Sequence, residues 1–340
     1  MNIVKQKIEF FHPLVDIAPK QAKKLFRFGI QVFAFREVTS LRRAGRLSPE
    51  KWNTSKSKSY RLTRNKKMRF VFLAILKKLS LVKGGDVLAV DFSDFGNGFQ
   101  VLMFAKQTKK GRALPVYFEI LRYPIQKGSQ NLFVNNAVDN ISRILGFKPK
   151  LVFDRGFACP FIIKFLAQNR YIFYIRIKKG KKVKLKTNGK LCASKNISKN
   201  DLLVLAYEKD LRLVISDEQE DMKEPWYIVT NDTVSTRNEI VGIYYHRFEI
   251  EEFFRDEKRL LGLEHVNWQK KSSLAVVLWF VVLGCWFAAE LEEKMSKEEQ
   301  KERDVFRLSS IRYFFEKAYK EMVLAFEAEF MRALMGENCV

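Results

Sequence analysis

The 340-residue sequence predicts an α/β fold in which helical regions flank a mixed β-sheet. Apolar residues recur at helical spacing in the first 82 residues, and three strand-like runs joined by short turns follow them. A strand, a helix and another strand then occur in succession. With 47% hydrophobic residues, the chain can bury a sizeable core and form two or three domains.

The first quarter of the chain is expected to be a basic helical region. Helical periodicity covers residues 21–35 and 68–82, and the Ser/Lys-rich stretch 48–67 between them is expected to be a loop suited to phosphate contact. Residues 1–85 contain 21 Lys/Arg against 4 Asp/Glu, whereas the rest of the chain contains 41 against 34. Positive charge is therefore concentrated near the N-terminus.

The formal net charge of the whole chain is +24. Such a charge is extreme for an enzyme of small molecules, and it predicts a polyanionic partner, either nucleic acid or an anionic membrane surface. A second basic run, residues 178–190, contains seven Lys in thirteen residues. Within it Lys181 and Lys182 are candidate DNA contacts, although a solvated loop is the alternative.

The central sheet is expected to begin after Gly84 and Gly85. Strands over 86–95, 99–106 and 113–121 form an antiparallel meander, and a helix follows over 132–146. The strand 150–153, the helix 160–169 and the strand 171–177 then imply a parallel pair joined by a crossover.

Residues 178–225 differ in texture, with partial alternation and short strand-like runs, and are expected to form a β-rich insertion outside the main sheet. A further strand covers 226–230 and begins with Trp226. This ring could stack on an unpaired base near a cleaved DNA end, or it could pack in the core.

The apolar stretch 272–289 contains 18 residues without a charge. It is borderline in length for a membrane span, and a buried core helix is the alternative. Residues 293–340 are expected to form charged amphipathic helices. The four Cys and three His show no zinc-ligand spacing, and no signal peptide is evident, which favours a reducing cytosol.

The stretch "YYHRFEIEEFFRDEK", residues 244–258, predicts an amphipathic helix. On such a helix Tyr244, Arg247, Glu251 and Lys258 share one stripe about 21 Å long. The stripe could act on one extended ligand, or it could be surface salt bridging between residues four apart. Glu249, about 160° from Glu251, is expected to lie outside any site on this stripe.

Three acids are candidates for a shared site: Asp91 on the first strand, Asp154 at the end of the fourth, and Glu251 on the stripe. Carboxylates without Cys or His are hard oxygen ligands that favour Mg²⁺ or Mn²⁺. Two such ions could activate a water or a 3′-hydroxyl in phosphodiester chemistry. Taken singly, a strand-end Asp is also a common turn former or helix cap.

The acids stand in a recognisable order. "DFS", "DRGF" and then Tyr244, Arg247, Glu251 and Lys258 at their spacings resemble the DDE transposases of bacterial insertion sequences, in the subgroup marked by a Tyr-Arg-Glu-Lys signature. "WYIVTND" upstream also resembles the strand that leads into the signature helix. The likeness extends from about Asp86 to Glu290. Ser93 stands where Thr is usual in the group, and Phe248 where Trp is frequent.

The resemblance implies a ribonuclease-H-like core with five strands in mixed orientation, flanking helices and a β-rich insertion before the last catalytic helix. The core would comprise residues 86–177 and 226–292, with the insertion at 178–225. Residues 1–85 would recognise DNA, and 293–340 would form a helical C-terminal region.

The resemblance also implies site residues and an activity. Asp91, Asp154 and Glu251 would form the metal-binding catalytic triad, and Tyr244, Arg247 and Lys258 would hold the DNA end. The expected function is cut-and-paste transposition, in which hydrolysis exposes a 3′-hydroxyl that attacks target DNA.

Partners would be double-stranded DNA at the element's ends and at the target, and a second copy of the chain in a homodimer, with no membrane. We expect a prokaryotic cytoplasmic protein, associated with the nucleoid when bound. The alternatives are a DNA-binding descendant that has lost activity, and a membrane-associated basic protein anchored by residues 272–289.

Overall fold

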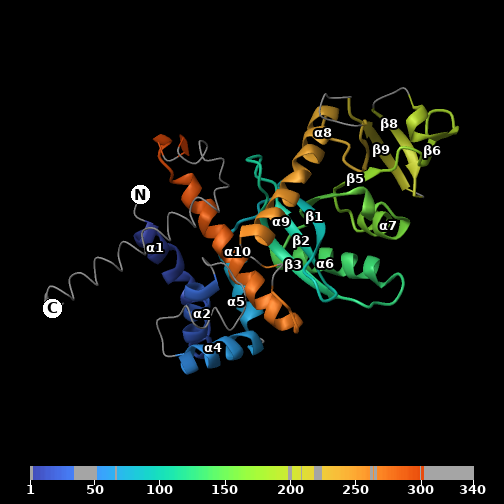
Figure 1. Ribbon diagram of the computed structural model, residues 1–340. Helices are drawn as coiled ribbons and strands as arrows, with labels where there is room; N and C mark the ends of the chain where they lie inside the picture. Colours follow the sequence, from blue (N-terminus) through green and yellow to red (C-terminus); the bar gives the residue numbers. More distant parts are fainter. Residues whose placement is uncertain are drawn as a thin grey trace, which may run out of the picture. The chain divides into compact units, whose positions relative to one another are not determined.

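The computed structural model describes residues 3–33, 52–65, 67–197, 201–207, 209–217, 224–260, 263, 266–298 and 300–301. The chain divides into two compact units, one of residues 1–78 with 257–340 and one of residues 79–256 (Figure 1). The sequence placed 226–292 wholly in the catalytic core, but the division falls near residue 256, so the apolar stretch 272–289 groups with the N-terminal helices. Most of 293–340 lies outside the described residues.

The first unit is helical. Its described helices are α1 (Ile3–Val15), α2 (Lys20–Phe33), α4 (Trp52–Arg64), α5 (Met68–Leu79) and α10 (Lys271–Glu293). α10 contacts α1, α2 and α4, and the ring of Phe280 packs edge-on against Phe72 of α5 at 4.9 Å. The aromatic side chains of α10 therefore form the core of this unit.

α10 is long and apolar enough to cross a membrane, with a mean hydropathy of 2.2 over its most apolar window. However, 83% of that window is buried inside the protein. This burial is what the core-helix alternative requires, because a helix that spans a bilayer places apolar side chains against lipid.

α4 occupies most of the stretch that was expected to be a loop. Its sequence has weak helix propensity, but Leu62 is fully buried and the ammonium of Lys58 lies 5.9 Å from the ring centre of Phe28. Because most helical stability in proteins comes from packing, contacts with α2 and α10 outweigh the local preference. The loop expected at 48–67 is therefore wrong for residues 52–64.

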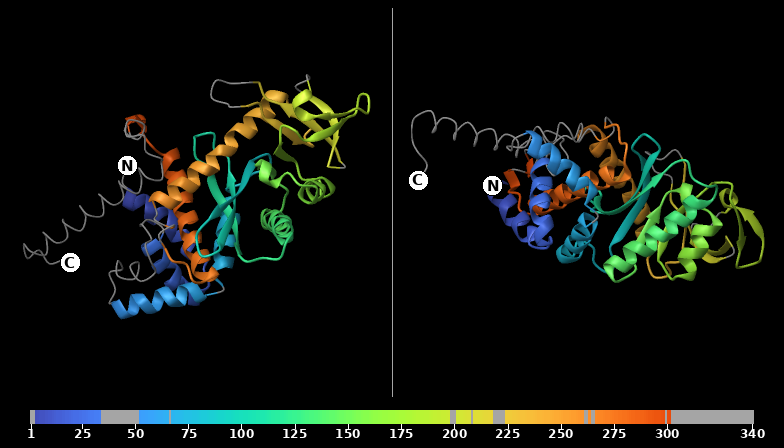
Figure 2. Two further views of the ribbon diagram at one scale, coloured as in Figure 1. Left: turned by 45° about the vertical axis from the view of Figure 1, so that its right-hand side comes forward. Right: turned by 90° about the horizontal axis from the view of Figure 1, so that it is seen from below.

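The second unit is built on one sheet in the order β3-β2-β1-β4-β5-β10-β9-β8-β6-β7 (Figure 2). β1 pairs in parallel with β4, as β4 does with β5, and the other neighbours are antiparallel. The strands are β1 (Val87–Asp94), β2 (Phe99–Lys106), β3 (Leu114–Arg122), β4 (Lys150–Phe153), β5 (Phe173–Ile177), β6 (Lys182–Leu185), β7 (Leu191–Ala193), β8 (Asp201–Ala206), β9 (Lys209–Ile215) and β10 (Tyr227–Thr230).

The expected sheet of five strands is thus part of a sheet of ten. β10 pairs with β5 on one side and with β9 on the other, so hydrogen bonds run without a break into β6–β9. The expectation that residues 178–225 lie outside the main sheet is wrong. The reason is that β10 would otherwise be an open edge, and β9 of the insertion pairs with it.

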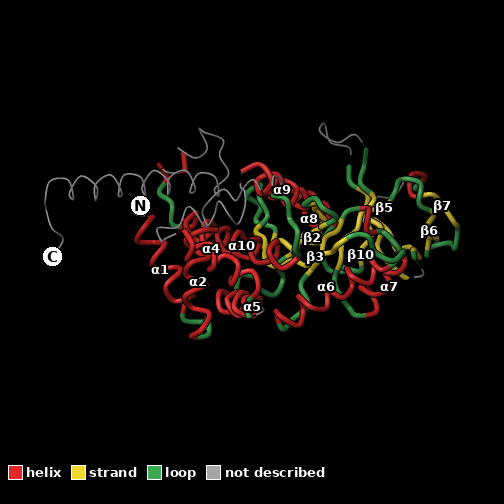
Figure 3. The backbone as a smooth tube through the Cα atoms, turned by 60° about the horizontal axis from the view of Figure 1, so that its bottom comes forward, coloured by secondary structure: helices red, strands yellow, loops and turns green. Residues whose placement is uncertain are grey.

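Helices cover both faces of this sheet. α6 (Ser129–Leu145) and α7 (Pro160–Gln168) lie on one face, and α8 (Arg237–Tyr245) and the start of α9 (Glu249–Leu260) lie on the other (Figure 3). Pro160 stands at the first position of α7, where its missing N–H costs nothing. The α8–α9 segment is the one that carries the Tyr-Arg-Glu-Lys residues.

Gly29 offers a test of the packing in the helical unit. A Cβ at this position of α2 would overlap the ring of Phe280. We expect Gly29→Ala to lower the free energy of unfolding by about 1–3 kcal/mol, because overpacked cores must shift. Gly242→Ala is the matched control, since this helical glycine of α8 has open space around it. The control should leave stability unchanged or raise it by up to about 1 kcal/mol. Equal melting curves for both variants would contradict this packing.

Candidate active site

Asp91 and Asp154 lie side by side on neighbouring central strands. Val90 of β1 is aligned with Phe153 of β4, and Asp91 and Asp154 are the residues that directly follow this pair. Asp91 accepts a hydrogen bond from the backbone N–H of Phe92 at 2.8 Å. Asp91 lies within β1 and Asp154 directly follows β4, and the parallel register of these strands brings together two of the three acids predicted from the sequence.

Glu251 lies on a segment that is not one continuous α-helix. α8 ends at Tyr245, a 3₁₀ turn spans His246–Phe248, and α9 begins at Glu249. A 3₁₀ turn has three residues per turn, so it rotates the residues after it relative to those before it. Arg247 is buried in this turn, yet Tyr244, Arg247 and Glu251 still lie together, because the guanidinium is 5.6 Å from the Tyr244 ring centre and bonds to Glu251.

Arg247 connects two of the acids. Its Nη2 donates a hydrogen bond to Oε1 of Glu251 at 2.8 Å, and its Nη1 lies 3.5 Å from Oδ2 of Asp91. The side chain is only 3% exposed, whereas that of Glu251 is 49% exposed. This geometry differs from the surface salt bridging that the sequence left open, because the guanidinium is buried.

Two donor atoms of Arg247, Nε and Nη1, are buried and have no hydrogen-bond partner in the described part of the chain. Leaving a buried donor unsatisfied costs about 1–3 kcal/mol. The ring of Phe248 lies 4.4 Å from the guanidinium and covers it. The guanidinium of Arg247 is therefore held among the acids with two donor atoms that could still form hydrogen bonds.

The charges of the site act on each other. Burial raises the pKa of Asp91 to about 6, against the opposing effects of Arg247 and the Phe92 N–H, and the charges of Asp154 and Glu251 raise it further. Burial alone would lower the pKa of Arg247, but Tyr244 and the three carboxylates raise it above its ordinary value. The acids share one environment, and Arg247 remains charged within it.

Tyr244 links Asp154 to an aromatic cluster that contains Trp226 and Phe248. Its hydroxyl donates a hydrogen bond to Oδ1 of Asp154 at 3.3 Å, and burial raises its pKa to about 12. Its ring meets that of Trp226 edge-on at 5.0 Å. Trp226 is 6% exposed and also packs against Phe248. The packing alternative thus fits Trp226, and its ring is not available to stack on a base.

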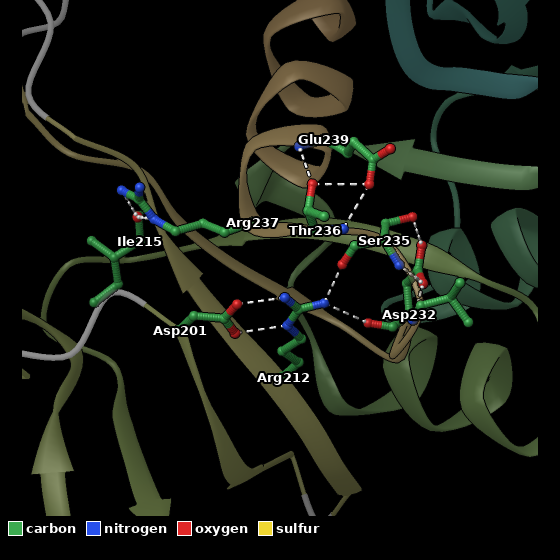
Figure 4. A network of polar contacts seen from close by, with 9 residues as sticks. Asp201, Arg212, Ile215, Asp232, Ser235, Thr236, Arg237 and Glu239 are labelled. Carbon is green, nitrogen blue, oxygen red and sulfur yellow. Dashed lines mark hydrogen bonds and ion pairs between the residues drawn. The ribbon is translucent and has the colours of Figure 1, made fainter.

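A polar network fixes the start of α8 (Figure 4). Asp232, 3% exposed, accepts hydrogen bonds from the backbone N–H groups of Val234 and Ser235 and from the hydroxyls of Tyr174 and Ser235. Burial would raise the pKa of Asp232, but these bonds hold it well below its ordinary value. The network therefore anchors the start of α8, the helix that carries Tyr244 in its last turn.

Two further contacts complete this junction. Thr236 and Glu239 form a reciprocal capping box at the first turn of α8. Arg212 of β9 pairs with Asp201 of β8 and donates to the carbonyl of Ser235 (Figure 4). The Thr-x-x-Glu pattern could have predicted this start of α8 from sequence, whereas the Arg212 contact carries no local signal.

Glu249 was expected to be uninvolved, but it is 5% exposed and accepts hydrogen bonds from the loop between β2 and β3. Its Oε2 accepts from the Thr108 N–H at 2.8 Å, and its Oε1 lies 3.1 Å from Nδ1 of His246. No sequence pattern pointed to this role, because the partners are backbone groups about 140 residues earlier.

The other predicted DNA contacts lie elsewhere. Lys182 is exposed on β6, and the ammonium of Lys181 lies 4.2 Å from the ring centre of Tyr207. β6 is six strands from β1, which corresponds to about 29 Å at 4.8 Å per strand. Lys258 is half-exposed on α9 and belongs to the other compact unit.

Within the described residues, no group of three or more His, Cys, Asp or Glu stands ready to hold a metal ion. The reason lies in the contacts above: Arg247 lies between Asp91 and Glu251, and Tyr244 bonds Asp154. The site therefore contains hard oxygen donors whose charge is balanced by an internal cation.

The raised pKa of Asp91 predicts a gain in stability when its charge is removed. Ionisation costs more in the folded than in the unfolded state, so the cost appears as pH rises from about 4 to about 6 and persists above. In metal-free buffer at pH 8, Asp91→Asn should raise the free energy of unfolding by about 2–3 kcal/mol. Below pH 4 the gain should vanish. Urea unfolding at both pH values checks this, and a gain of equal size at each would contradict it.

Part of the chain is similar to a known protein family. Residues 128–287 match the family described as "Transposase DDE domain", a stretch that includes Asp154 and Glu251 and begins after Asp91. A comparison with curated proteins found no match.

Solved structures give distant likenesses. A piggyBac transposase synaptic complex with hairpin DNA shares 12% identity over 94% of this chain and 80% of that chain, with a TM-score of 0.43. Human ENDOV shares 12% identity over 71% of this chain and 94% of that chain, with a TM-score of 0.27. Aquifex aeolicus Argonaute shares 13% identity over 58% of this chain and 29% of that chain, with a TM-score of 0.23. TM-scores below 0.5 do not establish a common fold. The family match shows that residues 128–287, which carry two of the three acids, are similar to a transposase DDE domain.

Proposed function

We propose that this protein is a DNA transposase and that Asp91, Asp154 and Glu251 form its catalytic site. The observation that carries the proposal is Arg247, which is 3% exposed, ion-pairs with Asp91 and Glu251, and has two buried donor atoms without a hydrogen bond among the described residues. A charged, incompletely bonded group buried among acids is costly to maintain, and such arrangements cluster at functional sites. The family match over residues 128–287 supports the same class.

We also propose that the strands and helices around the acids form a ribonuclease-H-like core. β3-β2-β1 form an antiparallel meander and β1-β4-β5 a parallel set, with helices on both faces. Asp91 lies within the first strand and Asp154 follows the fourth. β10 and the four strands of the insertion extend this core.

The donor set fits Mg²⁺ or Mn²⁺ in its chemistry, because three carboxylates provide hard oxygen ligands, and the contacts of Asp91 and Glu251 with Arg247 and of Asp154 with Tyr244 support a shared site. Asp91, Asp154 and Glu251 would hold the metal, as two ions. When bound, these ions supply an activated water or 3′-hydroxyl and stabilise the leaving oxygen of the phosphodiester.

The side chains around the acids would then position DNA. Two donor atoms of Arg247 have no hydrogen bond among the described residues, and a guanidinium pairs well with phosphate oxygens. Once the carboxylates are neutralised by metal, the guanidinium would bind a backbone phosphate of the cut DNA end instead. Phe248, against the guanidinium, and Tyr244, bonded to Asp154, would orient it. Lys258 would contact a neighbouring phosphate.

We further propose that the protein is a cut-and-paste transposase of a bacterial insertion sequence. It would act in the cytoplasm, as a homodimer, on double-stranded DNA. The spacing of Tyr244, Arg247, Glu251 and Lys258 supports the subgroup. The net charge of +24 supports DNA as the partner, and the basic residues 1–85 are suited to the element's ends.

Loss of any one acid should abolish cleavage while DNA binding persists. Asp91→Asn, Asp154→Asn and Glu251→Gln should each lower single-turnover nicking by about as much as a double substitution, because residues that work as a unit are not additive. Suitable substrates are linear duplexes carrying the DNA that flanks the reading frame, with Mn²⁺ present.

Asp94→Asn is the matched control for this experiment, since Asp94 is an exposed acid three residues along the same strand. Wild-type nicking rates in any of the three site variants would remove that residue from the site. Wild-type protein that binds these duplexes but never nicks them would favour the inactive DNA-binding alternative.

Arg247 provides a test that does not depend on activity. Arg247→Gln should lower the free energy of unfolding in metal-free buffer at pH 8 by about 3–5 kcal/mol, because it leaves three carboxylates without their cation. Added Mn²⁺ should restore much of this loss through binding to the folded state.

Arg255→Gln is the control, because Arg255 is 51% exposed and pairs with Glu252 on the same helix. Its loss should change stability by less than about 1 kcal/mol, with or without Mn²⁺. If Arg247→Gln behaves like Arg255→Gln, Arg247 is an ordinary ion pair.

A further inference from the structure

The loop between β2 and β3 is basic and lies against the segment that carries Arg247. We call residues 107–113 the lysine loop. It contains Lys109, Lys110 and Arg112 and no acid. Lys109 and Lys110 are exposed, and no ion pair involves either of them among the described residues. Arg112 lies 3.3 Å from Glu252 of α9.

Glu249 fixes this loop. Its two carboxylate oxygens accept hydrogen bonds from the N–H groups of Thr108 at 2.8 Å and Gly111 at 3.3 Å, and its carbonyl accepts from that of Ala113 at 3.1 Å. The Gln107 side chain also donates to the carbonyl of Ile243 at 2.8 Å. The loop is thus bonded on both sides of the 3₁₀ turn.

The loop is also braced internally. The Thr108 hydroxyl donates to the carbonyl of Arg112 at 2.6 Å and accepts from the N–H of Lys110 at 3.1 Å. Lys109 has a φ of +61°, a left-handed conformation that Gly or Asn adopts at lower cost. A lysine held at such a position in a braced loop indicates that its charged side chain is used.

The fold places the loop near the acids. Met103 of β2 is paired with Asp91, and β2 continues for three residues to Lys106, a distance of about 10 Å at 3.3 Å per residue. β2 runs antiparallel to β1, so it leads toward the start of β1, and the exposed lysines three and four residues beyond Lys106 are expected within about 10–20 Å of Asp91 at this rise. Along duplex DNA this corresponds to about three to six base pairs at 3.4 Å per step.

We propose that the lysine loop binds backbone phosphates of the DNA duplex about three to six base pairs from the scissile phosphate, and that Glu249 is the positioning residue that holds it there. This inference rests on the proposed transposase function and adds a contact surface to it. Lysines on a fixed loop would set the register of the duplex without reading its sequence.

The first test removes the charges of the loop. Lys109→Gln/Lys110→Gln should weaken binding to every duplex tested and make the dependence of log Kd on log salt shallower by about two. Lys83→Gln/Lys127→Gln is the matched control, since both lysines are exposed in the same unit but lie outside the loop. A loop variant that behaves as this control overturns the proposal.

The second test uses a difference in sign. Glu249→Gln removes a negative charge, so electrostatics alone predicts tighter DNA binding. The proposal predicts weaker binding, because the N–H groups of Thr108 and Gly111 bond to different oxygens of Glu249 and glutamine replaces one of these oxygens by an NH₂ donor, which releases the loop on that side. Asp94→Asn controls for the change in charge, because Asp94 is exposed in the same unit and its carboxylate accepts from the Gly96 N–H. Tighter binding by folded Glu249→Gln would overturn its positioning role.

A third measurement locates the contact. Neutral methylphosphonate linkages are placed singly along a duplex that wild-type protein nicks, and the loss of affinity should peak about three to six base pairs from the nick. In the loop variant that peak should disappear. If wild-type protein neither binds nor nicks, the proposed function and this inference fail together. If it nicks but no such peak exists, only this inference fails.

Discussion

A buried guanidinium surrounded by carboxylates is the constraint on which the second unit depends. Asp91 and Glu251 both repel their neighbours unless a cation is near, and Arg247 supplies it from the turn between two helices. A 3₁₀ turn interrupts the helical segment at residues 246–248, although the stretch 244–258 contains no Gly or Pro, and Phe248 covers the guanidinium. The local sequence favours a continuous helix here, and tertiary electrostatics override it.

The segment that carries Arg247 is held at both ends by buried carboxylates with a shared mode of bonding. Asp232 accepts two backbone N–H bonds before α8, and Glu249 accepts two after the 3₁₀ turn. Tyr244 and Arg247 lie between these anchors. Rigid support from such groups is how proteins hold functional side chains in place.

Local patterns predicted the elements whose information is local. The strand at 150–153 has the predicted bounds, the helices near 132–146 and 160–169 lie within a few residues of them, and the meander β1–β3 and the parallel pair β4–β5 follow from turn and crossover rules. The pairing of β1 with β4, which brings Asp91 beside Asp154, has no local signal, and only the family resemblance implied that the two acids share a site.

The misses depend on partners distant in sequence. α4 forms against α2 and α10, and Glu249 is defined by a loop about 140 residues before it. The insertion joins the sheet because β10 returns beside β5, which no pattern within 178–225 reveals. Periodicity predicts elements, but it does not identify which distant groups will satisfy a buried carboxylate.

The pairing of β5 with β10 has a consequence for how the protein is assembled. Ile177, the last residue of β5, is directly opposite Tyr227, the first of β10. Topologically, residues 178–226 are therefore the connection of a single β-hairpin, expanded until it contains four strands of its own. Its two ends meet at one ladder rung. The part of this connection that precedes β8 can thus vary in length or content while the strands that carry the acids keep their register.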